Sequence, residues 1–152
     1  HFLQRTFSKE AKSTIIQGGG NSKHPKYHEY NPELYSFKME GKKLLKLANE
    51  KLPLFIHDFF NQANSNLNEI DWIVPHQASK LGLRILENIN KKNSANILNQ
   101  LEYFGNCIAA SIPLTLVNGI LDKKIKDGDS CFLIGTAAGM TISGLQFKYS
   151  SK

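Results

Sequence analysis

Short strand-like runs alternate with helical patterns along most of this chain, and that alternation restricts the fold more than any other feature. The run Asp71–His76 (DWIVPH) has the length and β-branching of a buried strand, and apolar residues at helical spacing follow it over residues 79–90. Residues 97–103 form a weaker strand-like run, and a helix is expected over residues 109–125. This order predicts an α/β fold in which helices cover both faces of a mixed, mostly parallel sheet.

The first and last parts of the pattern are a long helix and a pair of strands. Apolar side chains recur at helical spacing from Met39 to Phe60, and Pro53 inside this stretch predicts either a kink or two abutting helices. Residues 131–149 read as two strands joined through Gly135–Gly139, which can pair antiparallel at an edge of the sheet. The helical side chains that we expect to face the core are Leu44, Ala48, Leu52, Phe55 and Phe59 in the first helix, Leu81, Ile85, Leu86 and Ile89 in the second, and Ile112, Leu116 and Ile120 in the third.

The chain divides into two parts of different character. Residues 1–36 are polar and rich in turn residues, so we expect a loop-rich N-terminal segment with one short strand, Ser13–Gln17. Residues 37–152 carry the alternating pattern. The first residue is His1 and methionine occurs only at positions 39 and 140, so we expect the chain to be a piece of a longer protein.

The composition fits one globular domain and argues against several partners. The net charge of +6 favours acidic partners, but the lysines fall in small groups without interleaved aromatic residues, so we expect no nucleic-acid partner. The most apolar stretch, residues 107–117, is shorter than the roughly 20 residues that span a bilayer, so we expect no membrane partner. Cys107 and Cys131 lack metal-ligand spacing and cannot make a disulfide framework, which predicts no metal site and a cytoplasmic location.

Two polar residues stand directly after strand-like runs. His76 follows the run at 71–75 and Asn106 follows the one at 97–103, and the carboxyl ends of parallel strands meet at one rim of a sheet. An imidazole and an amide offer hydrogen bonds without negative charge, which suits a carbonyl oxygen that gains charge during a reaction. From spacing alone, a loop histidine and an ordinary turn asparagine are the commoner interpretation, and the functional one stays open beside it.

Three blocks of sequence carry a resemblance to a known family. They are VPHQASKLGLRI, GNCIAASIPLTL and GDSCFLIGTAAGMTISGLQF, and the stretch FKMEGKKLLKLA adds to them. In this order and spacing they resemble the C-terminal half of a β-ketoacyl-[acyl-carrier-protein] synthase III, a thiolase-fold condensing enzyme. The resemblance covers residues 37–147 and implies that residues 37–152 are a thiolase-like half-domain whose N-terminal half is absent.

The resemblance implies roles for several residues. His76 and Asn106 would bind the malonyl thioester carbonyl and stabilise the enolate that forms on decarboxylation, and the turn with Ala138 and Gly139 would offer a backbone N–H to an oxyanion. The acyl-accepting cysteine would lie in the absent half, so neither Cys107 nor Cys131 would be the nucleophile and this chain alone would be inactive.

The resemblance also implies substrates and partners. The reaction belongs to fatty acid biosynthesis and needs no cofactor, with acyl-coenzyme A and malonyl-carrier as substrates. The partners would be acyl carrier protein, the N-terminal half and, in the full-length form, a second copy in a homodimer.

The chain departs from the family pattern at three places. Ser79 and Leu81 stand where the family commonly has asparagine and an arginine that docks the carrier, so Lys80 or Arg84 would have to take over that docking. Ala137 and Ala138 precede Gly139 in the closing turn, which would narrow an acyl pocket. Pro53 is unusual in a long helix but lies away from the chemistry.

Three alternatives stay open at this point. A thiolase-fold acyltransferase would use the same residues without decarboxylation. A Cys-His-Asn hydrolase would use Cys107 as nucleophile, because a helix N-terminus lowers a thiol pKa. A non-catalytic domain would bind an acidic carrier protein through Lys80 and Arg84.

Overall fold

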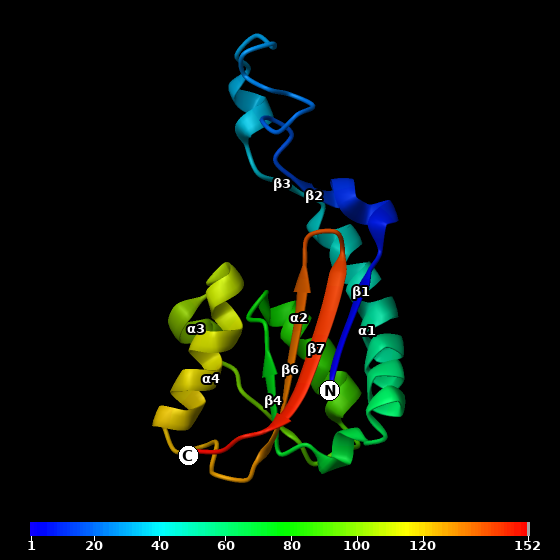
Figure 1. The fold of residues 1–152 in the computed structure, drawn as a ribbon, viewed down its shortest axis with the longest axis vertical. Helices are drawn as coiled ribbons and strands as arrows, with labels where there is room; N and C mark the ends of the chain where they lie inside the picture. Colours follow the sequence, from blue (N-terminus) through cyan, green and yellow to red (C-terminus); the bar gives the residue numbers. More distant parts are fainter. Residues whose placement is uncertain (152) are drawn as a thin grey trace.

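The structure, a computed structural model, describes residues 1–151 and is built around a five-stranded sheet (Figure 1). The strands follow the order β1-β7-β6-β4-β5. Their bounds are β1 Phe2–Thr6, β4 Trp72–Pro75, β5 Asn96–Ile97, β6 Ser130–Ala137 and β7 Thr141–Lys148. β4 lies parallel to both β5 and β6, and β7 and β1 extend the sheet in antiparallel pairing, so the sheet is mixed as expected.

Four α-helices and a small second sheet complete the described part of the chain. The helices are α1 Gly41–Ala63, α2 Lys80–Asn90, α3 Leu101–Phe104 and α4 Ser111–Leu121, with short 3-10 helices at η1 Ser8–Ser13, η2 Pro32–Tyr35, η3 Leu67–Glu69 and η4 Ile108–Ala110. The strands β2 Thr14–Ile15 and β3 Lys38–Met39 pair with each other, and with the loop between them they extend beyond the end of the main sheet (Figure 1). Within residues 1–151 no helix is both long enough and apolar enough to cross a membrane.

Helices cover both faces of the main sheet, as the alternating pattern predicts. One core lies under α1 and α2, where Phe59 packs against Phe132 with ring centroids 4.7 Å apart. A second core lies under α4 and includes Val74 and Cys131. Neighbouring residues of a strand point to opposite faces, so β4 and β6 supply side chains to both cores.

β4, the strand that leads to His76, is fixed at its first residue as well as along its ladder. The Trp72 indole N–H donates to Asp129 Oδ2 at 3.1 Å, just before β6 begins. The ladder then pairs Trp72 with Cys131 and Pro75 with Ile134. The position of His76 relative to β6 is therefore set by a continuous register.

Several boundaries differ from the expectations. The N-terminal segment holds two strands rather than one, and β1 is an integral edge of the main sheet. Only one of its residues is even partly buried, so it lacks the alternation that reveals a strand. α1 is one helix rather than two abutting ones, since core residues before and after Pro53 (Leu52 and Phe55) hold both sides of it in the same core.

The middle of the chain needs three further corrections. The expected strand at 97–103 is reduced to β5, because the Asn99 side chain accepts from Leu101 N–H at 3.1 Å as α3 begins. Leu81 is 51% exposed rather than core-facing, and Leu83 is buried in its place. α4 ends four residues before the expected position 125.

The closing strands also differ in detail from the expectation. They do pair antiparallel, but β1 covers β7 and the pair therefore does not form the edge. Gly135 belongs to β6, so the connection between the strands is only residues 138–140.

Candidate active site

His76 lies at the carboxyl end of β4, directly past the buried Pro75. Its backbone N–H donates to Ile134 O at 2.8 Å, which continues the pairing with β6 for one residue beyond the strand. The imidazole is half-buried, and burial lowers the pKa of His76 below the ordinary value of 6.5. Neither ring nitrogen bonds to any protein group between residues 1 and 151, so a neutral ring remains free to donate one hydrogen bond to a ligand.

Asn106 is exposed and leans on the loop that follows His76. Its Nδ2 donates to Ala78 O at 3.5 Å, and its Oδ1 accepts from Ile108 N–H at 2.9 Å. An amide nitrogen carries two N–H groups, so one remains available for a ligand. The structure thus brings the two residues to the same rim, with Ala78 as the point of contact between their loops.

The backbone around Asn106 is held in an unfavourable conformation. Gly105 has φ +64° and Ile108 has φ +52°, and a β-branched residue in the left-handed region is a rare outlier. In this conformation Ile108 N–H donates a hydrogen bond to Asn106 Oδ1. Such outliers concentrate at functional sites, where surrounding structure imposes them.

Gly135 is the glycine that lies beside His76. The expected oxyanion turn, with Ala138 and Gly139, lies further along the chain. A Cβ built on Gly135 would lie 3.5 Å from His76 Cβ and 3.0 Å from Ile112 Cδ1. Ala138 and Gly139 lie three and four residues further along, in the turn between β6 and β7. Their role as N–H donors stays a prediction.

The amide side chain of Gln77 was not singled out by the sequence patterns. It is only 1% exposed, and its Nε2 donates to Pro75 O at 2.9 Å and to Leu98 O at 3.1 Å. Its Oε1 accepts from Gln100 N–H at 3.0 Å. The sequence signal that could have identified this role is Pro75, a proline at the end of a central strand, with Gln77 two residues after it.

The first turn of α2 carries the expected docking residues. Ser79 caps the helix, because its Oγ accepts from Gly82 N–H at 3.1 Å, and serine and asparagine are equally good caps. Lys80 and Arg84 are exposed and lie four residues apart on one helix face. Neither forms an ion pair with any residue of the described range 1–151.

The two cysteines are placed poorly for nucleophilic catalysis. Cys131 is fully buried in β6, and burial raises the pKa of its thiol to about 11. The Cys107 thiol donates to Phe104 O at 3.3 Å, and its backbone N–H donates to Ser111 Oγ. Between residues 1 and 151, no group of three or more His, Cys, Asp or Glu side chains could hold a metal ion.

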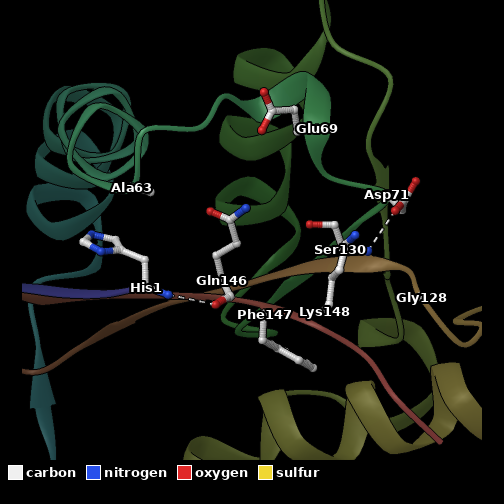
Figure 2. Close-up of a pocket in the computed structure, with 9 residues that line it drawn as sticks. All are labelled: His1, Ala63, Glu69, Asp71, Gly128, Ser130, Gln146, Phe147 and Lys148. Atoms are coloured by element: carbon white, nitrogen blue, oxygen red, sulfur yellow. Dashed lines mark hydrogen bonds between the residues drawn. The ribbon is translucent and has the colours of Figure 1, made fainter.

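Two surface cavities are lined by residues of the sheet, and neither is a substrate-sized pocket around His76. The larger one, about 720 Å³, lies at the amino ends of β4 and β6 beside Asp71 and Ser130, which is the opposite end of the sheet (Figure 2). The cavity beside His76 measures only about 40 Å³ and is lined by Ala78, by residues of α1 and α2, and by Ile134, Gly135 and Thr136 of β6. Ligand sites usually enclose roughly 300–1,000 Å³, so this rim alone is an incomplete site.

The sequence matches a family model described as 3-oxoacyl-[acyl-carrier-protein (ACP)] synthase III C terminal, over residues 60–149. The β-ketoacyl-[acyl-carrier-protein] synthase III of Porphyra umbilicalis is 38% identical over 117 residues, which are 75% of this chain and 35% of that protein. The protein of the same name from Prochlorococcus marinus (strain NATL2A) is 34% identical over 130 residues, 84% of this chain and 35% of that protein. The chain therefore spans about a third of the length of these curated relatives.

Solved structures support the same fold. A crystal structure of a 3-oxoacyl-(acyl-carrier-protein) synthase III aligns with a TM-score of 0.86 and 20% identity over 98% of this chain and 47% of that one. The enzyme from Thermus thermophilus aligns with a TM-score of 0.79 and 21% identity over 99% of this chain and 46% of that one. At this identity the likeness concerns the fold, and it confirms the thiolase-like α/β class.

Proposed function

Because this chain belongs to the 3-oxoacyl-[acyl-carrier-protein] synthase III family and represents its C-terminal part, we propose that it forms half of a decarboxylating condensing enzyme of fatty acid biosynthesis. The observation that carries the proposal is the hydrogen bond from Asn106 Nδ2 to Ala78 O, two residues after His76, which joins the two loops at the carboxyl rim of the sheet. The reaction joins an acyl thioester to a malonyl group held on acyl carrier protein and releases CO₂.

The two side chains suit the charge that develops in this reaction. When the malonyl carboxylate leaves as CO₂, the electron pair of the broken C–C bond passes to the thioester carbonyl as an enolate. Burial lowers the pKa of His76, so its ring is neutral and donates one hydrogen bond, and Asn106 Nδ2 donates another. A well-placed donor of this kind stabilises the charge by about 2.7–4 kcal/mol.

The acyl group needs a nucleophile that this chain does not offer. The pKa of Cys131 is raised to about 11 by burial, and Cys107 follows Asn106 with its thiol directed to Phe104 O. We assign the cysteine that takes the acyl group from coenzyme A to a complementary N-terminal half. This chain alone is then unable to condense its substrates.

The outer face of α4 supports contact with that N-terminal half. Val117 and Leu121 lie four residues apart on α4 and are 49% and 72% exposed. Exposed apolar side chains that gather on one face mark contact surfaces for other polypeptides. Packing of the N-terminal half on this face would also enclose the open rim around Asn106, and we expect the complete enzyme to be a homodimer.

Docking of the acidic carrier is proposed for the exposed face of α2. Lys80 and Arg84 point to solvent without ion-pair partners within the described part of the chain, and Leu81 between them contributes no charge. In the complete enzyme, Lys80→Glu and Arg84→Glu should weaken carrier binding most at low salt. Lys92→Glu, the same charge change beyond the far end of α2, is the control, and an equal loss there would contradict specific docking.

We place the enzyme in the cytoplasm because both cysteines of this chain, Cys107 and Cys131, are free. This location suits a protein whose substrates are coenzyme A and carrier thioesters.

The test measures the two half-reactions of the complete enzyme separately. His76→Ala and Asn106→Ala should each lower CO₂ release from malonyl-carrier by about 10²–10³-fold. Cys107→Ser is the matched control next to Asn106 and should retain activity. Unchanged CO₂ release in both alanine variants would refute the proposed function, and acyl transfer without any CO₂ release would favour the non-decarboxylating acyltransferase.

A further inference from the structure

Pro75 interrupts the ladder between β4 and β5 at its last position. Asn96 N–H donates to Asp71 O at 2.9 Å and Leu98 N–H donates to Ile73 O at 3.0 Å, which is the regular parallel pattern. The next bond of that pattern would run from the nitrogen of residue 75 to Leu98 O. Proline has no N–H, so this bond cannot form.

The side chain of Gln77 supplies the missing donor. Its Nε2 reaches Leu98 O at 3.1 Å and also Pro75 O at 2.9 Å, while its Oε1 accepts from Gln100 N–H at 3.0 Å. Both N–H groups and the carbonyl oxygen of this amide are therefore used, at a position that is almost fully buried. We propose that Gln77 is a positioning residue, whose buried amide sets the separation of His76 and Asn106 by joining the end of β4 to the segment that leads to Asn106.

His76 and Gln77 attach the end of β4 to the segments on its two sides, β6 on one side and the chain after β5 on the other. The backbone N–H of His76 is bound to Ile134 O of β6, and the next residue is bound to the chain after β5. The end of β4 is thus held between its two neighbours even though the ladder to β5 has stopped. This arrangement restricts the direction in which the imidazole projects.

The segment that leads to Asn106 is held at its first residue, Gln100, by side-chain amides. Gln100 begins α3, since its carbonyl accepts from Tyr103 N–H and Phe104 N–H at 3.1 Å each, and Asn106 follows two residues after that helix. The Gln100 side chain, itself buried, accepts from Asn118 Nδ2 of α4 at 3.1 Å. Gln77, Gln100 and Asn118 therefore form one chain of hydrogen bonds from β4 to α4.

Loss of the Gln77 amide should act on catalysis through geometry. An apolar side chain at this position leaves Leu98 O and Gln100 N–H buried without partners, and the backbone must shift for them to find new ones. A misplacement of about 1 Å can cost a reaction about 10²-fold in rate. Because Gln77 has no polar group left to touch a substrate, its effect must pass through His76 and Asn106.

The experiment rests on the proposed function and uses the complete enzyme with Gln77→Met, which keeps the side-chain length and removes the hydrogen bonds. We expect CO₂ release from malonyl-carrier to fall about 10–100-fold in kcat. Acylation of the enzyme by acyl-coenzyme A, which does not need the two donors, should change less than about twofold. Ile73→Val on β4, the strand that precedes Gln77, is the control for general destabilisation and should leave both half-reactions intact.

Each outcome decides the inference. Equal loss of both half-reactions in Gln77→Met, in proportion to a loss of folded protein, would mean that Gln77 is merely structural and would overturn it. If Gln77→Met does not fold, Gln77→Glu keeps the oxygen that accepts from Gln100 N–H and loses both N–H donors. CO₂ release within twofold of the parent in that variant would overturn the inference, whereas a selective loss would support it. Unchanged CO₂ release in both His76→Ala and Asn106→Ala would instead refute the proposed function, and the inference with it.

Discussion

Replacing Gly135 by alanine should destabilise the protein through one identifiable contact. The new methyl group would lie 3.0 Å from Ile112 Cδ1 on α4, which is closer than carbon atoms normally approach, and 3.5 Å from His76 Cβ, which is ordinary contact. Overpacking costs about 1–3 kcal/mol, and replacing glycine by alanine inside a strand returns about 0.5–1 kcal/mol. The free energy of unfolding should therefore fall by up to about 2.5 kcal/mol.

A second substitution isolates that contact. Ile112→Val removes the Cδ1 atom itself and should cost only about 0.5–1.5 kcal/mol by itself, since Ile112 is half-buried. In the double variant the two costs should not add, because the atom that meets the new methyl group is gone. We expect a favourable coupling of about 1 kcal/mol, within the range for residues in contact.

The assay is urea denaturation of the four proteins of this double-mutant cycle, with the midpoint compared at constant slope. Gly135→Val extends the series, because its larger side chain should restore the clash even when it is combined with Ile112→Val. Strictly additive effects of Gly135→Ala and Ile112→Val would refute the reasoning, since they would show that β6 and α4 do not meet at this point.

Three further predictions concern the two loops of the site. Ser79→Ala should lose the cap on Gly82 N–H and about 1 kcal/mol of stability, whereas Ser79→Asn should keep both, as thermal unfolding of the two variants can show. Ile108→Asn should raise the stability by about 1 kcal/mol, because asparagine tolerates a positive φ, and an unchanged or lower melting temperature would contradict the strain at this residue. Burial lowers the pKa of His76, so the unfolded chain binds this proton more readily than the folded protein. The contribution of the neutral His76 ring to the free energy of unfolding is complete above the ordinary pKa of about 6.5. It is lost as the pH falls from there toward the lowered pKa that His76 has in the folded protein. Urea titrations between about pH 5.5 and 7.5 should show this loss for the parent and a weaker one for His76→Gln.

The sequence predicted the location of His76 and Asn106 correctly, because that location depends on short local patterns and on the direction of the strands. The run that ends at Pro75 has the length of a buried strand, and the structure places His76 directly past its end. Asn106 reaches the same rim although the strand expected before it is reduced to two residues, because the short helix α3 covers the remaining distance. The prediction of a shared rim depended only on parallel strand direction, which the pairing of β4 with β5 and β6 provides.

The parts that could not be predicted depend on contacts between distant segments. The role of Gln77 follows from the register of β4 against β5, which no local pattern contains. The strand β1 is recognised only by its backbone pairing with β7, since most of its side chains face solvent. Leu81 follows the apolar spacing of α2 but projects from the opposite side of its first turn to Leu83, which is the residue that reaches the core.

The indole of Trp72 gives this sheet an optical reporter of its own. It is the single tryptophan of the chain, it stands on the strand that leads to His76, and its N–H is bound to Asp129 at the start of β6. Its fluorescence should therefore change when β4 and β6 come together, and removing the acceptor with Asp129→Ala should shift the emission without touching the rim. Refolding followed by the fluorescence of Trp72 would report the pairing of β4 with β6, the strands that position His76, separately from the docking of any other polypeptide.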